Sequence, residues 1–124
     1  MKLEVGMYVK TKNGYICKII NINDLREPNM KYGVEASYLK DIMFIGDDDI
    51  LKASYNIIDI LEVGDYVNGK EIVNIGYLTN GTRKGTKIID YYITPDAISY
   101  LENEDIKSVI THEQMEQMAY KVGE

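Results

Sequence analysis

The segment LEVGMYV at residues 3–9 returns as LEVGDYV at residues 61–67, and the two copies differ only in that Asp65 replaces Met7. Each copy places a glycine, which tolerates a sharp bend, before a short run of strand-forming residues. Asn-Gly follows both copies, at residues 13–14 and 68–69. Asn-Gly between apolar runs is the strongest short signal for a β-hairpin with a two-residue type I′ turn. The sequence therefore predicts two similar opening hairpins, one in each half of an internally duplicated chain.

The correspondence between the halves extends beyond the opening hairpins. The segment that begins at residue 48 resembles the one that begins at residue 104, an offset of 56. Apolar and aromatic runs at residues 15–22, 32–34, 41–45 and 87–93 have the composition of strands. Thr111 and Gln114 have the spacing of a capping box, and Met115, Met118 and Ala119 follow on one face of the helix that it starts. Residues 55–61 are the counterpart of this helix in the first half.

These patterns predict a mainly β fold with short helices, in the α+β class. We expect two SH3-like antiparallel β halves, residues 1–60 and residues 61–124, each with about four short strands and one helical turn. A chain of 124 residues has the size of one typical domain. The halves are therefore expected to share one core in a single compact domain, with the C-terminal helix at residues 111–119.

The single difference between the two copies gives a further expectation. A charged side chain is rarely buried without a partner, so we expect Asp65 to face solvent or to cap a local turn, and Met7 to be at least partly buried. Alternation along a strand places Val5, Met7 and Val9 on one face. The same alternation would place Asp65 on the face of its apolar neighbours, which conflicts with its charge.

The composition favours a folded protein that does not contact nucleic acid directly. Hydrophobic residues make up 45% of the chain, charged residues make up 27%, and the formal net charge is −6. Binding to phosphate backbones needs clustered Lys and Arg, so we expect a protein partner, and a monomer or homodimer. No apolar run approaches the roughly 18 residues of a membrane helix, and no secretion leader is recognisable. We therefore expect no membrane contact and a cytoplasmic location.

The residues that carry most enzymatic chemistry are scarce. Cys17 is the only cysteine and His112 is the only histidine. This count excludes an intramolecular disulfide and disfavours a multi-histidine metal site and the common nucleophile–histidine arrangements. Cys17 lies in an apolar run and is expected in the core, whereas His112 follows a helix cap and is expected at the surface. Carboxylate-pair hydrolysis stays open, but no pair stands out, so we expect no catalytic activity, no cofactor and no metal.

Two acidic clusters and one basic loop are the candidate partner-binding sites. The acidic clusters lie at equivalent places in the two halves and consist of Asp47, Asp48 and Asp49 in the first and Glu102, Glu104 and Asp105 in the second. The first cluster lacks the spacing of a calcium loop and is expected in a solvated loop that opens a helical turn, but two spaced acidic patches can imitate a row of phosphates. The basic loop at residues 80–87 contains Arg83 and Lys84 and lacks the residue order of a P-loop. We expect this loop to be an exposed hairpin tip, and contact with an anion or a partner is the alternative.

Tyr8 and Tyr66 occupy the same position in the two copies. One interpretation places both tyrosines in the core, with each hydroxyl reaching an edge partner. The other places them on a shared binding face, because tyrosine is enriched in protein interfaces. The sequence leaves both interpretations open.

Two stretches resemble a family of small phage and prophage proteins of Gram-positive bacteria. They are NIIDILEVGDYVNGKEI at residues 56–72 and SVITHEQMEQMAYKV at residues 108–122. The resemblance rests on a Val-Gly-Asp-x-Val-Asn-Gly hairpin and an Ile-Thr-x-Glu-Gln helix start. It covers the second half of the chain, fits the first half loosely, and supplies no catalytic residues.

The resemblance implies a phage accessory protein inside a bacterial host cell. Small acidic phage proteins without enzyme motifs often block host machinery, including CRISPR effector nucleases. We therefore expect an inhibitor that occupies the basic channel of a nucleic-acid-binding host defence protein through an acidic face. The alternatives are a small-molecule or nucleotide-binding or hydrolytic protein with a pocket between the halves, and a phage assembly or regulatory module.

Overall fold

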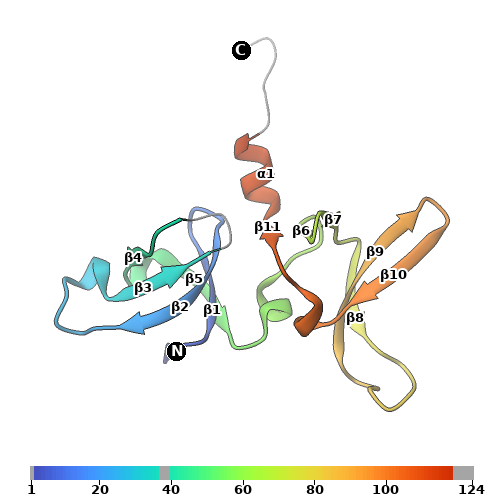
Figure 1. Ribbon diagram of the computed structural model, residues 1–124, viewed down its shortest axis with the longest axis horizontal. Coiled ribbons are helices and arrows are strands. Elements are labelled where there is room, and N and C mark those ends of the chain that lie inside the picture. The colour runs from blue at the N-terminus through green and yellow to red at the C-terminus, as the bar shows by residue number, and fades with distance from the viewer. Residues whose placement is uncertain (1, 37–39, 119–124) are drawn as a thin grey trace, which may run out of the picture.

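A computed structural model describes residues 2–36 and 40–118 of the chain (Figure 1). The strands are β1 (Tyr8–Thr11), β2 (Ile16–Ile22), β3 (Tyr32–Glu35), β4 (Met43–Ile45), β5 (Ile50–Ser54), β6 (Tyr66–Val67), β7 (Lys70–Glu71), β8 (Asn74–Tyr77), β9 (Lys87–Thr94), β10 (Ala97–Leu101) and β11 (Val109–Ile110). Short 3-10 turns lie at η1 (Pro28–Met30), η2 (Asp47–Asp49), η3 (Ile57–Ile60) and η4 (Asn103–Asp105), and the helix is α1 (His112–Met118). The fold is therefore mainly β, as the sequence predicts.

The strands form three antiparallel sheets. The first half contributes one five-stranded sheet in the order β4-β3-β2-β1-β5, so the last strand of this half returns to pair with its first. The second half contributes two three-stranded sheets, β11-β6-β7 and β10-β9-β8. Figure 1 shows the five-stranded sheet on the left, the long β9–β10 hairpin on the right, and α1 rising between them.

The two copies of the opening motif fold in the same way. Gly6 and Gly64 both adopt a left-handed conformation, with φ of 96° and 98°, which side chains disfavour. The N–H of Gly6 donates to Ile19 O at 2.9 Å, and the N–H of Gly64 donates to Ile72 O at 3.0 Å. The N–H groups of Met7 and Asp65 close the preceding turns at 3.2 Å and 3.0 Å. The repeated glycine therefore marks a repeated bend.

This bend changes which side chains the motif buries. Met7 and Asp65 are both buried, and so are Val9 and Val67. Val5 and Val63, which precede the glycines, are 55% and 57% exposed. The expectation that Val5 shares a face with Met7 is therefore wrong. Strict alternation holds only within a strand, and the left-handed glycine between the two residues interrupts it.

The two Asn-Gly sequences form different turns. Asn68 and Gly69 have φ of 52° and 80°, as a type I′ turn requires, and they connect β6 to β7 directly. In the first half Gly14 has a positive φ but Asn13 does not, and the Gly14 N–H donates to Thr11 O at 2.9 Å within the loop that joins β1 to β2. The expected two-residue turn is thus found in the second half and replaced by a longer loop in the first.

Asn68 also connects its turn to the segment that follows η4. Its side-chain Oδ1 accepts hydrogen bonds from the N–H of Lys107 at 2.8 Å and of Ser108 at 3.1 Å, and its Nδ2 donates to Asp105 O at 2.8 Å. One side chain thereby fixes the chain that leads into β11, although β6, β7 and β11 have only two residues each.

Buried apolar side chains form two clusters, where we expected one. The first cluster belongs to the first half and contains Met7, Val9, Cys17, Ile19, Tyr32, Val34 and Ile45. The second contains Ile16, Ile57, Ile58, Ile60, Leu61, Val67, Ile72, Ile89 and Val109. Because Ile16 comes from β2, the second cluster joins both halves, and η3 supplies three of its nine buried residues. Cys17 is a buried core residue, as expected.

Helix α1 follows the second half but is anchored to the first. Thr111 and Gln114 form the predicted capping box, with Thr111 N–H donating to Gln114 Oε1 at 3.0 Å and Gln114 N–H donating to Thr111 Oγ1 at 3.1 Å. The Thr111 hydroxyl also donates to Gly14 O, and Gln117 Nε2 donates to Asn13 O at 3.0 Å. A Cβ atom at Gly14 would lie 2.5 Å from the Cβ of Glu113, so the β1–β2 loop approaches α1 as closely as a glycine permits.

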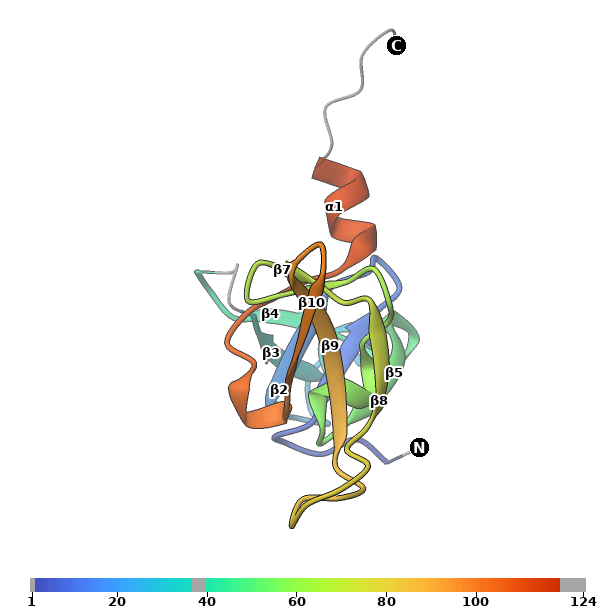
Figure 2. The same ribbon diagram turned by 90° about the vertical axis from the view of Figure 1, so that its right-hand side faces the viewer.

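Figure 2 shows α1 projecting from one end of the molecule. Met115 and Met118 are exposed, and position 119 lies outside the described residues.

Candidate functional site

The first acidic cluster is the exposed 3-10 turn η2, and two of its three carboxylates hold the local structure. Asp49 Oδ2 accepts the N–H of Gly46 at 2.9 Å, and Asp47 Oδ1 accepts the hydroxyl of Tyr32 at 2.5 Å. Burial and the hydrogen bond to Asp47 raise the pKa of Tyr32. Asp48 is exposed and, in the described part of the chain, has neither a hydrogen bond nor an ion pair. It is therefore the carboxylate of η2 that can meet a partner without loss of an internal contact.

The second acidic cluster is partly neutralised by the basic loop. Arg83 Nη2 lies 2.6 Å from Glu102 Oε1 and 2.7 Å from Glu104 Oε1. A hydrogen bond to Glu104 raises the pKa of Arg83, and backbone and Arg83 hydrogen bonds lower the pKa of Glu104. Asp105 Oδ2 accepts the N–H of Glu102 at 3.0 Å, the same cap that Asp49 forms in η2. The loop and the second cluster, expected as separate contact surfaces, are joined, and Lys84 remains exposed.

The most concentrated group of charges lies where α1 begins, between the two halves. Lys10 from β1 is 2% exposed, and its Nζ lies 2.8 Å from Glu113 Oε2 and 3.5 Å from Glu62 Oε1. Burial disfavours the charged form of Lys10, but the hydrogen bond to Glu113 and the nearby carboxylates outweigh it and raise its pKa. Lys52 from β5 lies 3.0 Å from Glu62 Oε1 and lowers the pKa of Glu62 through that hydrogen bond.

Asp65 and His112 complete this charged cluster. Asp65 is fully buried, and its Oδ1 lies 2.7 Å from His112 Nδ1 and 2.8 Å from the backbone N of His112. Its Oδ2 accepts the N–H of Glu62 at 2.8 Å. Asp65 therefore caps a local turn, as one branch of our expectation states, but does so from a buried position. His112 Nε2 lies 3.6 Å from Glu62 Oε2 and 3.0 Å from Glu113 Oε1.

The sequence reasoning placed none of these residues in a site. The one signal was the change from Met7 to Asp65 between otherwise matching copies, which indicates that the side chain at this position makes different contacts in the two halves. Lys10 gives no such signal, because a lysine in a short strand usually keeps its ammonium in water. His112 lies partly at the surface, as expected, but both of its ring nitrogens face carboxylates.

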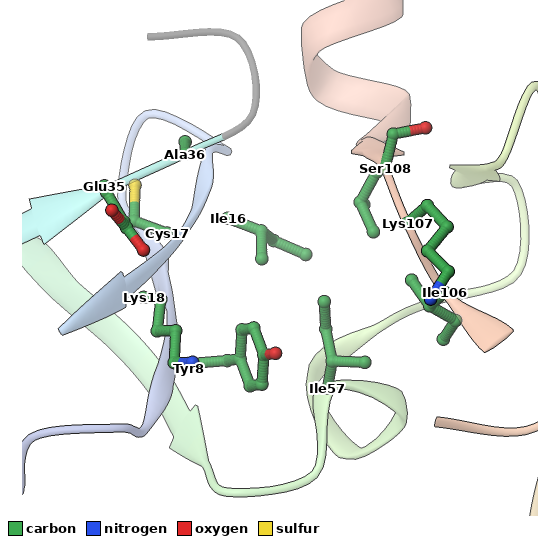
Figure 3. A pocket seen from close by; sticks show the side chains of 11 residues that line it. Tyr8, Ile16, Cys17, Lys18, Glu35, Ala36, Ile57, Ile106, Lys107 and Ser108 are labelled. Carbon is green, nitrogen blue, oxygen red and sulfur yellow. The ribbon is translucent and has the colours of Figure 1, made fainter. Parts of the chain in front are cut away.

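A pocket of about 350 Å³ opens between the first-half strands and the segment that leads into β11. Tyr8, Ile16 and Ile57 point into this space from β1, β2 and η3 (Figure 3). Lys18, Glu35, Lys107 and Ser108 add polar groups to its lining. The Lys18 ammonium lies 5.8 Å from the centroid of the Tyr8 ring. Tyr8 thus contributes to the pocket as well as to the core, whereas Tyr66 donates its hydroxyl to Glu71 at 3.1 Å.

Cys17 is 1% exposed, and the ring nitrogens of His112 face the carboxylates of Glu62, Asp65 and Glu113. In residues 2–36 and 40–118, no helix is both long and apolar enough to cross a membrane. Comparisons of the chain with protein-family models, curated proteins and solved structures found no match.

Proposed function

We propose that the chain is a non-enzymatic protein-binding module made of two SH3-like halves. In each half the last strand follows a capped 3-10 turn and pairs with the first strand: β5 follows η2 and pairs with β1, and β11 follows η4 and pairs with β6. Taking β7 and β8 as two parts of one bent strand gives the second half the order β10-β9-β8/β7-β6-β11. This order matches the β4-β3-β2-β1-β5 order of the first half and supports the duplication.

We further propose that this module is a phage accessory protein that inhibits a nucleic-acid-binding host defence protein, with CRISPR effector nucleases as one class of target. The motifs at residues 56–72 and 108–122 and the net charge of −6 support this proposal. The main support comes from the η2 turn. There Asp48 is exposed and has no ion-pair partner among the described residues, and it lies between two carboxylates that fix the turn. The second cluster carries Arg83 and is the weaker mimic of phosphate charge.

The expected result of Asp48→Lys is slower association with the partner. The partner is first captured from host lysate on the immobilised chain and identified by mass spectrometry. Charge attraction acts mainly on the encounter, so the association rate constant should fall about threefold to tenfold at low salt, and the difference should shrink as screening increases. Surface plasmon resonance at two salt concentrations measures both quantities.

Asp96→Lys is the matched control, because it makes the same charge change at an exposed turn between β9 and β10. Its association rate should stay close to that of the unmodified chain. Equal slowing by both variants would show a general effect of net charge and contradict a contact at η2. Capture of no specific protein by the folded chain would contradict the inhibitor proposal itself.

The pocket favours a second candidate function, the binding of a small ligand between the halves. An apolar floor formed by Tyr8, Ile16 and Ile57 with a few surrounding charges is typical of ligand sites, and 350 Å³ lies at the lower end of their volumes. A nucleotide or similar small anion present at 100 times its Kd should raise the free energy of unfolding by about 2.7 kcal/mol. A thermal-shift series with nucleotides tests this, and Ser108→Trp, which enlarges a side chain that lines the pocket, should abolish the shift. Shifts that persist in Ser108→Trp would place the ligand elsewhere.

A further inference from the structure

We propose that Glu62, His112 and Glu113 form a binding site for one divalent transition-metal ion, best matched by Zn²⁺. Each residue offers one ligand atom, and these atoms lie within 4.8 Å of one another. The ligands come from two places in the chain, since Glu62 precedes β6 whereas His112 and Glu113 begin α1. Bound metal would therefore tie the start of α1 to the loop before β6.

Two of the three separations among the ligand atoms suit a tetrahedral ion, and the third is within 4.8 Å. Zn²⁺ lies about 2.0–2.2 Å from imidazole nitrogen and carboxylate oxygen, which places neighbouring ligands of a tetrahedron roughly 3.4 Å apart. His112 Nε2 lies 3.0 Å from Glu113 Oε1 and 3.6 Å from Glu62 Oε2, so the two distances bracket that value. Three protein ligands leave a fourth position for water, and all three side chains are partly exposed.

Asp65 gives the histidine the orientation that a metal ligand needs. Its buried carboxylate accepts the Nδ1–H of His112 at 2.7 Å, which leaves the lone pair of the neutral ring on Nε2, toward the two glutamates. Metal-bound histidines almost always donate their other ring N–H to such a group. The Asp65 carboxylate also accepts the backbone N–H groups of Glu62 and His112, and these two hydrogen bonds fix it from both sides of the site.

Lys10 contacts one carboxylate oxygen of each glutamate and leaves the other oxygen to face His112. It lies against Oε1 of Glu62 and Oε2 of Glu113, whereas the other oxygen of each side chain faces His112 Nε2. Glu113 Oε1 is buried and has no hydrogen-bond partner in the described part of the chain. Lone pairs on this oxygen and on Nε2, only 3.0 Å apart, repel each other unless a positive charge lies between them.

A metal ion satisfies this arrangement more completely than a second ring proton. An N–H at Nε2 would donate a hydrogen bond to Glu113 Oε1, but Glu62 Oε2 at 3.6 Å is beyond hydrogen-bond distance. A divalent ion takes all three atoms. With a neutral ring, the cluster of Lys10, Lys52, Glu62, Asp65 and Glu113 contains two positive and three negative groups, so one negative charge is left to attract the ion.

Titration of the EDTA-treated full chain with Zn²⁺ in a calorimeter tests the proposal. We expect one ion per chain, a rise in the thermal unfolding temperature with Zn²⁺, and tighter binding of Zn²⁺ than of Mg²⁺, because imidazole suits Zn²⁺. Co²⁺ used in place of Zn²⁺ should give the visible absorption of a tetrahedral ion. His112→Gln should abolish saturable binding, and Glu62→Gln should weaken it at least tenfold.

Asp65→Asn should weaken Zn²⁺ binding about 10-fold to 100-fold, as changes to groups that orient a ligand do. Glu116→Gln is the control, because Glu116 is exposed on α1 and lies outside the cluster, and its affinity should match that of the unmodified chain. Circular dichroism confirms that each variant is folded. Equal Zn²⁺ affinity in His112→Gln and the unmodified chain would overturn the proposal.

Discussion

Ile58→Ala is expected to lower the free energy of unfolding by about 3–4 kcal/mol, out of a typical total of about 5–15 kcal/mol. Ile58 lies in η3, is 1% exposed, and belongs to the cluster that contains residues from both halves. Its truncation removes buried apolar surface and leaves a cavity that rigid neighbouring strands cannot close. Urea unfolding followed by circular dichroism measures the loss as a lower midpoint at an unchanged slope.

Ile98→Ala makes the same chemical change on β10, where the side chain is 57% exposed. It should cost less than about 1 kcal/mol, because little buried surface is lost. Both variants should unfold in one transition by two different probes, since Ile16 carries the second cluster into the first half. Two separate transitions, or equal losses in the two variants, would show that the halves do not depend on η3.

The local elements were predictable because single residues determine them. Asn68 and Gly69 specify a turn that needs positive φ at both positions, and Thr111 and Gln114 specify a helix start by mutual hydrogen bonds. Asn13 and Gly14 did not give the same turn as residues 68–69. The β1–β2 loop also packs against α1, so a tertiary contact overrides the local preference there.

The charged cluster was not predictable because its members lie far apart in the sequence. Lys10 meets Glu62 and Glu113 only after β1, the loop before β6 and α1 are assembled. Likewise, Arg83 meets Glu102 and Glu104 because the β8–β9 loop folds against η4. Composition gives the net charge of −6, but pairing decides which acids remain available to a partner.

Asp65→Ala is expected to lower the free energy of unfolding by about 3 kcal/mol. The Asp65 carboxylate receives the backbone N–H groups of Glu62 and His112 as well as His112 Nδ1–H. Each buried donor left without an acceptor costs about 1–3 kcal/mol, and the lower end applies here because His112 and Glu62 are partly exposed to water. Asp65→Asn keeps one acceptor oxygen and should lose about half as much, as urea unfolding at neutral pH would measure.

The first copy of the motif explains why this position differs. Met7 Sδ accepts the N–H of Glu4 at 3.3 Å, as Asp65 Oδ2 accepts that of Glu62, so the local turn can close with either side chain. A Cβ atom at Gly6 would lie 3.7 Å from Tyr55, and one at Gly64 would lie 3.8 Å from His112. Tyr55 and His112 therefore occupy equivalent places beside the repeated glycine. Only the second half starts an α-helix there, whose first N–H and histidine require an anionic acceptor. Asp65→Met should therefore restore the turn and still lose most of the stability that Asp65→Ala loses. Full stability in Asp65→Met would show that the carboxylate serves the turn alone and that α1 does not depend on it.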